Sequence, residues 1–441
     1  PGIVNFIQRR LYTYPVKNGT LNSVSNEADM IKNIQDKTFT IVLAGGRGAR
    51  LQPLTEERTK PAVPFAGKYR IIDFTLSNCL HSGLRRILVL TQYKSQSLQE
   101  HLRDGWSILN PELNEYITPV PPQMRTGENW YAGTADAIYQ NLNLLEESGA
   151  QFVLILSGDH IYRMDYAAIL EHHVKHNAAA TVACMEVGLE EARGFGIVSI
   201  DHDKRILSFI EKPDNPQGLP DNPDCTLASM GIYVFSMDVL RRELNIDYED
   251  ESSSHDFGKD ILPRMIGQQA VFAFRFGSHE GRVSQDRYWK DVGTLDAYYD
   301  ANMTLLEPVP PLNLYQRDWP IRSYLPQSPP ARTVPGPDGH DGIIYNSSIA
   351  GGTVINGGTV RHSILSAWVK VEHAALVEDC ILFNNVTVGP GAKLKRCIVD
   401  KHVRIPEGES IGYDLERDRQ RFTVTDNGVV VVGRRVTFDN S

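Results

Sequence analysis

The sequence predicts an α/β domain with a mostly parallel sheet, followed by a smaller domain built as a parallel β-solenoid. Short β-rich runs alternate with helical patterns between residues 39 and 306, prolines cluster between residues 307 and 342, and aliphatic residues then recur at a spacing of 17. A chain of 441 residues is also longer than one hydrophobic core usually serves. We expect an N-terminal lead-in at residues 1–36, the α/β domain at 37–306, a proline-rich linker at 307–342 and the solenoid at 343–441.

Composition excludes several classes of protein. Hydrophobic residues make up 41% and charged residues 22%, and no apolar run is long enough to span a bilayer. Lysine and arginine number 45 against 54 acidic residues, a net charge of −9, so the chain lacks the basic footprint of a nucleic-acid binder. The five cysteines form no C-x-x-C pair, which fits reduced thiols in a cytoplasm. The first 36 residues contain no continuous apolar core of the kind that a secretory signal needs, and we interpret them as a polar lead-in.

The first domain alternates strand-like and helix-like segments. This alternation predicts a Rossmann-like sheet flanked by helices, in which ligands bind beyond the carboxyl ends of the strands. The strand-like runs are residues 39–43, 86–90, 152–156, 180–183 and 230–235, and the clearest helical patterns are residues 135–147 and 166–176.

A loop of glycines and arginines follows the first strand, in the stretch TFTIVLAGGRGARLQPLTEERTKPAVPFAG. Gly45, Gly46 and Gly48 let backbone N–H groups approach a ligand, and the guanidinium groups of Arg47 and Arg50 favour a polyphosphate. Neither the Walker pattern nor the dinucleotide fingerprint is present. The loop therefore predicts an anion site, and a tight turn with solvated arginines is the alternative.

Two carboxylates elsewhere in this domain are candidate metal ligands, and the first of them follows a strand-like run. Asp159 lies in LSGDHIY and Asp291 in YWKDVGT. A carboxylate pair beside a polyphosphate loop suits Mg²⁺, which takes carboxylate, phosphate and water oxygens. Alternatively, Asp159 caps a turn and Asp291 caps a helix that covers residues 294–302.

Two further segments offer groups for a sugar phosphate and a base. FIEKP supplies Glu211, which can accept hydrogen bonds from hydroxyl groups, and Lys212, which can meet a phosphate. WYAGTADAIYQN opens a helix near Thr134, with small residues where a flat base could approach the backbone. The alternative for Lys212 is a solvated strand end.

The C-terminal segment contains a repeat, visible when HSILSAWVKVEHAALVE, DCILFNNVTVGPGAKLK and RCIVDKHVRIPEGESIG are aligned. Aliphatic residues at matching points of successive coils, with glycines at corners, predict a solenoid that stacks on a shared core. The pattern resembles the hexapeptide repeat of left-handed parallel β-helices. The aligned columns are Ile364, Ile381 and Ile398; Val369, Val386 and Val403; Val371, Val388 and Ile405; and Val377, Leu394 and Ile411.

Such coils form the active sites of many acyltransferases, which use a histidine base. His362, His373 and His402 are candidates, but each has a different position in the coil. We favour a structural or regulatory solenoid that packs subunits together.

Taken together, the motifs resemble those of the bacterial glucose-1-phosphate adenylyltransferases, or ADP-glucose pyrophosphorylases, from about residue 39 to about residue 432. Sugar-nucleotide pyrophosphorylases generally share GGRG and TKPA, whereas WYAGTADA, SSHDFGKD and WPIR narrow the resemblance to the ADP-glucose branch. It implies an Mg²⁺-dependent nucleotidyltransferase domain that transfers AMP from ATP to α-D-glucose 1-phosphate, for glycogen or α-glucan synthesis. It also implies a homotetramer.

The resemblance assigns roles to residues of this chain. Catalysis falls to Arg50, Lys60 and Asp159, and Mg²⁺ to Asp159 and Asp291. The arginine and the lysine would neutralise the triphosphate and the leaving group. The implied substrate-binding residues are Gly45, Gly46, Gly48, Tyr131, Gly133, Gly196, Glu211, Lys212 and Ser229.

The family is usually allosteric, with an anionic effector between the two domains. Matching regulatory positions are Arg58, Arg70, Lys395, Arg396 and Arg434, with Gln92 and Trp130 linked to communication between the sites. Three positions depart from the enteric pattern, which is activated by fructose 1,6-bisphosphate and inhibited by AMP: Glu57 replaces a lysine, Pro64 a histidine and Glu147 an arginine. A glutamate beside a bisphosphate repels it, so we expect a different activator or weak activation.

Two other functions remain open at this point. The loop and the carboxylates would serve a sister enzyme that uses UTP or dTTP equally well, because they bind phosphates and metal and not the base. A non-catalytic regulatory subunit would commonly lose a key charged residue, whereas Arg50, Lys60, Asp159, Lys212 and Asp291 are all present.

Overall fold

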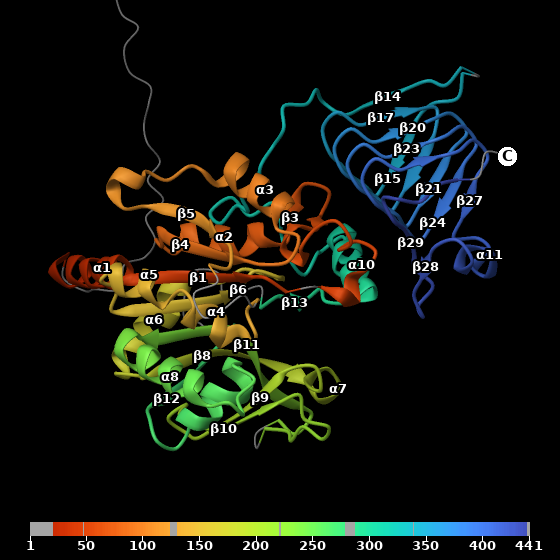
Figure 1. The fold of residues 1–441 in the computed structure, drawn as a ribbon. Helices are drawn as coiled ribbons and strands as arrows, with labels where there is room; N and C mark the ends of the chain where they lie inside the picture. Colours follow the sequence, from red (N-terminus) through yellow and green to blue (C-terminus); the bar gives the residue numbers. More distant parts are fainter. Residues whose placement is uncertain are drawn as a thin grey trace, which may run out of the picture.

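The structure is a computed structural model that describes residues 21–46, 48–123, 130–219, 222–277, 287–337 and 339–438. Residues 1–20 of the predicted lead-in lie outside the described residues, and residues 21–36 form helix α1 (Leu21–Asp36). Figure 1 shows an α/β domain beside a solenoid of stacked short strands. Within the described part of the chain, no helix combines the length and hydrophobicity needed to cross a bilayer.

The α/β domain is organised around a sheet for which nine strands are described, in the order β10-β9-β11-β6-β1-β4-β5; β8 also pairs with β11, and β12 pairs with β8. Strands β5, β4, β1 and β6 are parallel, as predicted. Beyond β6 the sheet becomes mixed, because β11 runs antiparallel to β6, β8 and β9. The strands are β1 (Thr38–Ala44), β4 (Arg86–Thr91), β5 (Tyr116–Val120), β6 (Phe152–Ser157), β8 (Ala180–Gly188), β9 (Gly196–Ile200), β10 (Ile206–Glu211), β11 (Cys225–Ser236) and β12 (Val271–Arg275).

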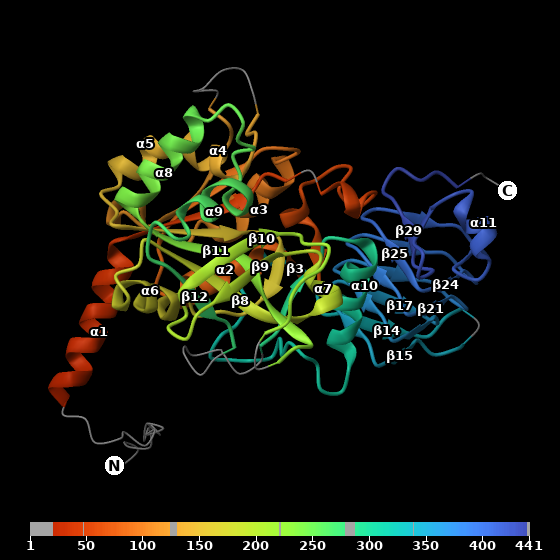
Figure 2. The same cartoon turned by 90° about the horizontal axis from the view of Figure 1, so that it is seen from below.

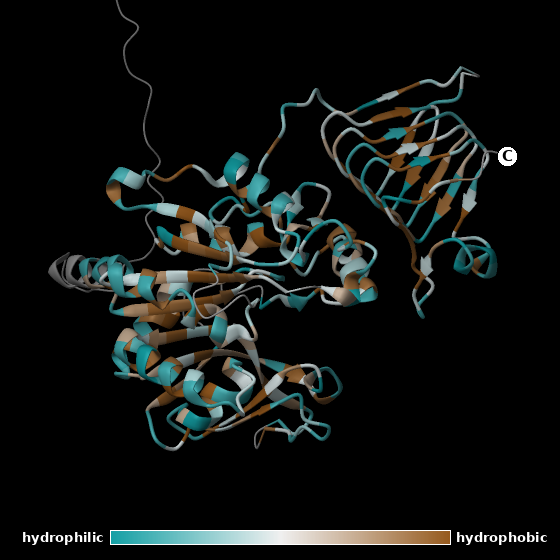
Figure 3. Ribbon diagram, viewed as in Figure 1, coloured by the Kyte–Doolittle hydropathy of each residue, from teal (hydrophilic) through white to brown (hydrophobic). Residues whose placement is uncertain are grey.

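Helices cover both faces of this sheet, and each face has its own core. Side chains of β1 alternate between the two cores, Ile41 in one and Val42 in the other, as the period of a strand requires. In Figure 3 the hydrophobic residues follow these central strands. The helices are α2 (Ile72–His81), α3 (Gln96–Trp106), α4 (Thr134–Tyr139), α5 (Leu142–Glu147), α6 (Tyr166–Lys175), α7 (Leu189–Ala192), α8 (Met237–Glu249), α9 (Leu262–Met265) and α10 (Leu295–Met303).

The helix predicted over residues 135–147 is two helices, α4 and α5, that meet at Asn141. The Asn141 side-chain amide donates to the carbonyl of Ala137 at 2.8 Å and to the hydroxyl of Tyr131 at 3.0 Å. Asparagine side chains compete in this way with the regular backbone ladder, which helices need to continue.

Two short antiparallel ribbons lie beside the main sheet. The first pairs β7 (His160–Tyr162) with β13 (Trp289–Asp291). The second pairs β2 (Pro64–Phe65) with β3 (Tyr69–Arg70).

The solenoid has three parallel faces, and its register follows the predicted columns. Ile364, Ile381 and Ile398 are direct partners in successive coils. Val371, Val388 and Ile405 pair in the same way on another face, and so do Val377, Leu394 and Ile411 on the third. The first face consists of β14 (Arg332–Val334), β17 (Val354–Asn356), β20 (Lys370–Val371), β23 (Thr387–Val388) and β26 (Arg404–Ile405), and the second of β15 (Ile343–Tyr345), β18 (Thr359–Arg361), β21 (Leu376–Glu378), β24 (Lys393–Lys395) and β27 (Ser410–Ile411). The third consists of β16 (Ser348–Ile349), β19 (Ile364–Leu365), β22 (Ile381–Leu382), β25 (Cys397–Val399) and β29 (Val430–Val432), and β28 (Thr423–Val424) is added at its end, antiparallel to β29. Helix α11 (Leu415–Arg419) lies outside the three faces.

The passage at residues 307–342 is not a free extended linker. Leu312, Trp319 and Ile321 are buried against the α/β domain, which explains why the chain here stays docked despite its prolines. Strand β14 also lies inside this passage and pairs with β17, so the first coil begins before residue 343.

The two domains share a hydrophobic core. Helix α10 lies between the sheet and the solenoid in Figure 2, and its Tyr298 and Tyr299 belong to the same cluster as Ile381 and Val431 of the solenoid. The segment around Leu51 joins the same cluster. The solenoid is therefore packed against the loop that follows the first strand.

Candidate active site

A cavity of about 620 Å³ lies beyond the carboxyl ends of β1, β4 and β6, where an α/β sheet binds its ligands. It brings together residues that are far apart in the sequence. The residues predicted for the phosphates, the base and the metal that line it are Gly45, Gly46, Gly48, Arg50, Lys60, Gly133 and Asp159. Tyr131, which was predicted for the sugar, and Gln92 line it too.

The glycine loop has the backbone shape that an anion site needs. Gly48 has φ +60°, a left-handed conformation, and a Cβ there would lie 3.2 Å from Cβ of Lys60. The loop is held by the hydroxyl of Thr55, which donates to the carbonyl of Gly48 at 2.8 Å. At Gly133 a Cβ would lie 2.1 Å from the carbonyl oxygen of His255, so only glycine fits where α4 begins.

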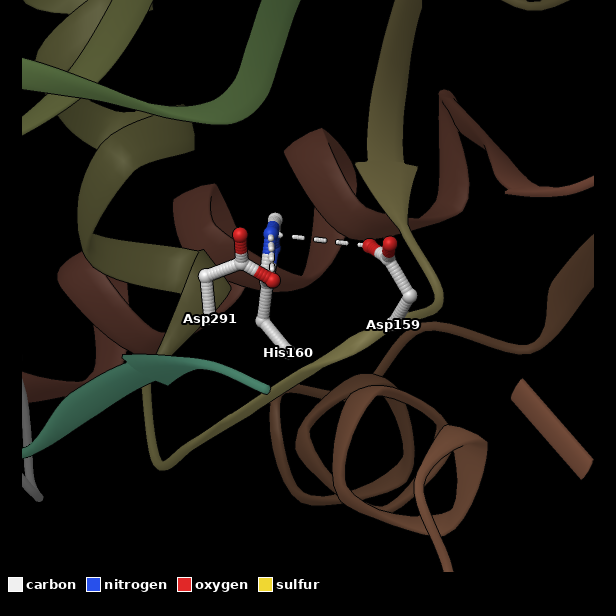
Figure 4. Close-up of side chains that lie close together, drawn as sticks. All are labelled: Asp159, His160 and Asp291. Carbon is white, nitrogen blue, oxygen red and sulfur yellow. Dashed lines mark ion pairs between the residues drawn. The ribbon is translucent and has the colours of Figure 1, made fainter. Parts of the chain in front are cut away.

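The two predicted carboxylates meet through the β7–β13 ribbon. Asp159 directly precedes β7, Asp291 ends β13, and His160 is paired with Asp291 across the ribbon. One ligand atom from each of these three side chains lies within 4.8 Å of the other two. Figure 4 shows the three side chains gathered at one point, with the imidazole between the carboxylates.

The ammonium group of Lys60 bridges the two carboxylates. Its Nζ lies 2.9 Å from Oδ2 of Asp159 and 2.8 Å from Oδ1 of Asp291. Burial alone would lower the pKa of Lys60, but the two carboxylates outweigh it and raise the pKa above the usual value. Burial would raise the pKa of Asp159, but the charge of Lys60 and the hydrogen bond from the Ser157 hydroxyl lower this pKa below the usual range.

Mg²⁺ fits this set of ligands. The ammonium contacts show that the two carboxylates converge on a position where a cation is stabilised. Oδ2 of Asp291 faces Arg50 Nη2 at 4.0 Å, so the carboxylates keep oxygens beyond those that Lys60 uses. Burial lowers the pKa of His160, which keeps the imidazole neutral and able to offer a lone pair. Asp159 and Asp291 would hold the ion, with His160 beside them.

The residues predicted for the sugar lie together at the neighbouring sheet edge. Glu211 pairs with Gly196 between β10 and β9, and a Cβ on Gly196 would lie 2.8 Å from Oε2 of Glu211. Ser229 follows Ala228, which pairs with Ile197 of β9. Gly196, Glu211 and Ser229 are not among the residues that line the main cavity. A Cβ on Gly258 would lie 3.0 Å from Oε2 of Glu211 and 3.4 Å from Oδ1 of Asp256, which does line the cavity, so the group flanks it.

Lys212 directly follows β10, and its side chain is largely in solvent. Its side chain is 61% exposed, and Nζ lies 3.4 Å from Oε1 of Glu211. Its backbone N–H donates to the carbonyl of Phe195 at 3.0 Å, which holds the residue at a φ of +47°. The ammonium group is therefore available to an incoming anion.

Sequence reasoning missed Asp256 and His160 as site residues. Asp256 lines the cavity and accepts a hydrogen bond from the hydroxyl of Thr134 at 3.0 Å. It also accepts from the backbone N–H groups of Gly258 and Lys259, so it caps a helical turn while facing the cavity. The motif SSHDFGKD was visible in the sequence but carried no strand-end signal of the kind that marked Asp159. His160 was in view within SGDHIY, and only the ribbon pairing reveals its position.

The basic residues predicted for an effector divide into two groups. The Arg58 guanidinium contacts Asp400 of the solenoid at 2.9 Å, and both side chains are almost fully buried. Burial and the charges of Arg70 and Arg58 lower the pKa of Lys401 to about 7, and Arg434 adds to this effect. These cations therefore gather at the domain interface, and Lys401 is a member that the sequence did not suggest.

Lys395 and Arg396 contact aromatic rings instead. Lys395 Nζ lies 5.9 Å from the ring of Tyr413, and the guanidinium of Arg396 lies 5.1 Å from the ring of Tyr299. Trp130 is 58% exposed.

The three departures from the enteric pattern have separate environments. Glu57 forms an ion pair with Arg435 at the end of the solenoid. Pro64 lies in β2, where its carbonyl accepts a hydrogen bond from Tyr298, and Glu147 is exposed at the end of α5. In the solenoid, the candidate base His362 is paired with Asp379 at 2.6 Å.

Comparison with known proteins agrees with this geometry. Residues 39–308 match the family model described as nucleotidyl transferase, and residues 329–432 match the GlmU-like C-terminal hexapeptide model. The chain is 59% identical to a protein of Vibrio cholerae named glucose-1-phosphate adenylyltransferase 2, over 91% of this chain and 98% of that protein. It is 50% identical to the glucose-1-phosphate adenylyltransferase of Dechloromonas aromatica, over 91% and 92% of the two chains. It is 49% identical to that of Rhodopirellula baltica, over 94% and 92%. The chain therefore belongs to the nucleotidyl transferase family and, within it, to the glucose-1-phosphate adenylyltransferases.

Proposed function

We propose that this protein transfers AMP from ATP to α-D-glucose 1-phosphate, giving ADP-glucose and pyrophosphate for glycogen or another α-glucan. The observation that supports this most directly is the convergence of Lys60, Asp159 and Asp291 beside the glycine loop. The names of the relatives supply the substrates. All five cysteines of the chain are free thiols, which supports a cytoplasmic site of action.

The chemistry needs positioning and charge neutralisation more than a base. The phosphate oxygen of the sugar is already anionic at neutral pH and attacks the α-phosphorus of ATP in line with departing pyrophosphate. Backbone N–H groups of the glycine loop would cradle the triphosphate, and Arg50 and Lys60 would neutralise the charge that develops on the leaving group. Mg²⁺ held by Asp159 and Asp291 would supply further positive charge to the phosphate oxygens when bound.

The sugar phosphate would enter along the flank. The exposed ammonium group of Lys212 would grip the phosphate, and Glu211 would accept hydrogen bonds from hydroxyl groups of the sugar. Gly196 leaves the space in front of Glu211 free, because a side chain there would collide with its carboxylate.

The choice of nucleotide can be tested directly. Release of pyrophosphate should be measured with glucose 1-phosphate and ATP, UTP or dTTP in turn, with Asp159→Asn as the inactive control. We expect ATP to give the highest kcat/KM and the control to lose kcat with little change in KM. A preference for UTP or dTTP would favour the sister enzymes, and no turnover with any nucleotide would favour a regulatory subunit.

We also propose allosteric control by an anion and a homotetrameric assembly. The cluster of Arg58, Arg70, Lys401 and Arg434 supports the first, because cations gathered in one place favour an anionic partner. A panel of sugar phosphates and AMP should change turnover, with fructose 1,6-bisphosphate weak because Glu57 adds negative charge and already pairs with Arg435. Strong activation by that compound would contradict this. Light scattering on the purified chain decides the assembly.

A further inference from the structure

A strap formed by residues 312–323 lies against the end of the ribbon that carries the two carboxylates. The Trp319 indole is 1% exposed, and its Nε1–H donates to Oδ1 of Asn78 at 3.0 Å. Asn78, which is fully buried in α2, donates in turn from Nδ2 to the carbonyl of Tyr162 at 3.2 Å. Tyr162 is the last residue of β7, so one amide side chain connects the strap to the ribbon.

A second contact joins the strap to the next residue of the chain. Nη1 of Arg163, whose side chain is fully buried, donates to Oε1 of Gln316 at 3.1 Å. The strap itself is fixed to α2, since the backbone N–H of Arg322 donates to the hydroxyl of Ser77 at 2.9 Å. The strap thus holds the end of β7 at two consecutive residues.

The ribbon needs such support. Each of its strands has three residues, and two-stranded ribbons are marginally stable on their own. It is not a member of the main sheet. Because His160 and Asp291 are partners across the ribbon and Asp159 adjoins it, the position of the ribbon sets the distance between the carboxylates and Lys60. Mg²⁺ tolerates little departure from octahedral geometry, so a small displacement of the ribbon weakens its site.

We propose that Trp319 and Asn78 are positioning residues for the divalent-cation site, acting through the carbonyl of Tyr162. This inference rests on the proposed function, because it assigns the ribbon to a metal-dependent transfer. The strap continues along the chain to β14, the first strand of the solenoid. The solenoid and the metal-bearing ribbon are therefore connected by one docked segment, which offers a path between the domain interface and the active site.

The test compares Trp319→Phe with Trp106→Phe in the full-length protein. Both changes remove one buried indole N–H donor. That of Trp106 lies 2.9 Å from Oδ1 of Asp73, whose Oδ2 accepts from the hydroxyl of Ser323 at the end of the strap, so it contacts neither Asn78 nor the carbonyl of Tyr162. Mn²⁺ serves as the paramagnetic probe, and its free fraction is measured by electron paramagnetic resonance with an unreactive methylene analogue of ATP. We expect Trp319→Phe to weaken Mn²⁺ binding by about 3- to 10-fold, the effect of one lost hydrogen bond. Trp106→Phe should lower Tm to an extent similar to Trp319→Phe but keep the wild-type affinity for Mn²⁺.

A second variant covers the case in which Trp319→Phe fails to fold. Gln316 is only half-buried, so Gln316→Ala should fold and should also weaken Mn²⁺ binding. The proposal would be overturned if every strap variant that folds bound Mn²⁺ with wild-type affinity. It would also be overturned if Trp106→Phe weakened Mn²⁺ binding as much as Trp319→Phe. Turnover of ATP with glucose 1-phosphate by the wild-type chain is measured separately. Its absence would remove the proposed function, whereas the Mn²⁺ titrations would still decide the role of the strap.

Discussion

Replacing Lys60 with methionine should change cation binding and turnover in opposite directions. The ammonium group lies 2.9 Å from Asp159 and 2.8 Å from Asp291, so it competes with a metal ion for the same carboxylates. Removing it abolishes a repulsion between charges of +1 and +2, about 2 kcal/mol at about 4 Å in a water-like medium, and Mg²⁺ affinity should rise about 30-fold. Turnover should fall by about 10²- to 10³-fold, the usual effect of losing one preorganised group that stabilises developing charge.

Two measurements separate these effects. Calorimetric titration with Mg²⁺ in the presence of an unreactive ATP analogue gives the affinity, and pyrophosphate release gives kcat. Lys68→Met is the matched control, because its ammonium group lies over the ring of Tyr69 at 5.3 Å and outside the residues that line the cavity. Weaker Mg²⁺ binding in Lys60→Met, or a kcat close to the wild-type value, would refute the reasoning.

Three other predictions test the flank and the domain interface. Lys212→Ala should raise the KM for glucose 1-phosphate by about 10- to 150-fold, from the loss of a charged hydrogen bond, and a fall in kcat at constant KM would contradict its role. Asp400→Leu should lower the free energy of unfolding in urea by about 3–5 kcal/mol, because it strands the buried Arg58 charge, and Arg58→Met in the same chain should restore most of it. Little loss in the single variant would show that the pair is not buried in solution. The pKa of Lys401 is lowered to about 7, below its value in the unfolded chain. Between these two pKa values the unfolded chain binds more protons than the folded chain, so Lys401 makes the free energy of unfolding rise with pH over that range. Lys401→Gln should flatten that rise in urea titrations, and an unchanged slope would contradict the shift.

The sequence predicted which residues form the site better than it predicted the contacts between those residues. Asp159 was identified because it follows a predicted strand, and parallel strands end at one edge of a sheet. Asp291, which ends a strand of an antiparallel ribbon, was identified as a second carboxylate suited to Mg²⁺. The solenoid register followed from a strict spacing, which repeats specify directly. The bridge formed by Lys60 depends on a turn that begins after Thr59 and is fixed by its hydroxyl on the carbonyl of Ala44, a contact without a sequence pattern.

The strap shows where composition misled the prediction. Many prolines favour an extended linker, and a single tryptophan without a periodic partner gives no signal of burial. The docking of Trp319 depends on the amide of Asn78, and such a pairing between distant side chains becomes visible only in the folded structure.

The loop between Gly48 and Lys60 connects the domain interface to the active site. Arg58 points to the solenoid and is buried against Asp400, whereas Lys60, two residues later, points to the carboxylates of the active site. Both positions are tightly held, since Thr59 between them is fully buried and hydrogen-bonded to the end of β1. Such a segment cannot adjust one side without the other, because packed interiors transmit displacements and do not absorb them. An anion that rearranges the cations around Arg58 would therefore change the position of Lys60, and with it the charge presented to the triphosphate.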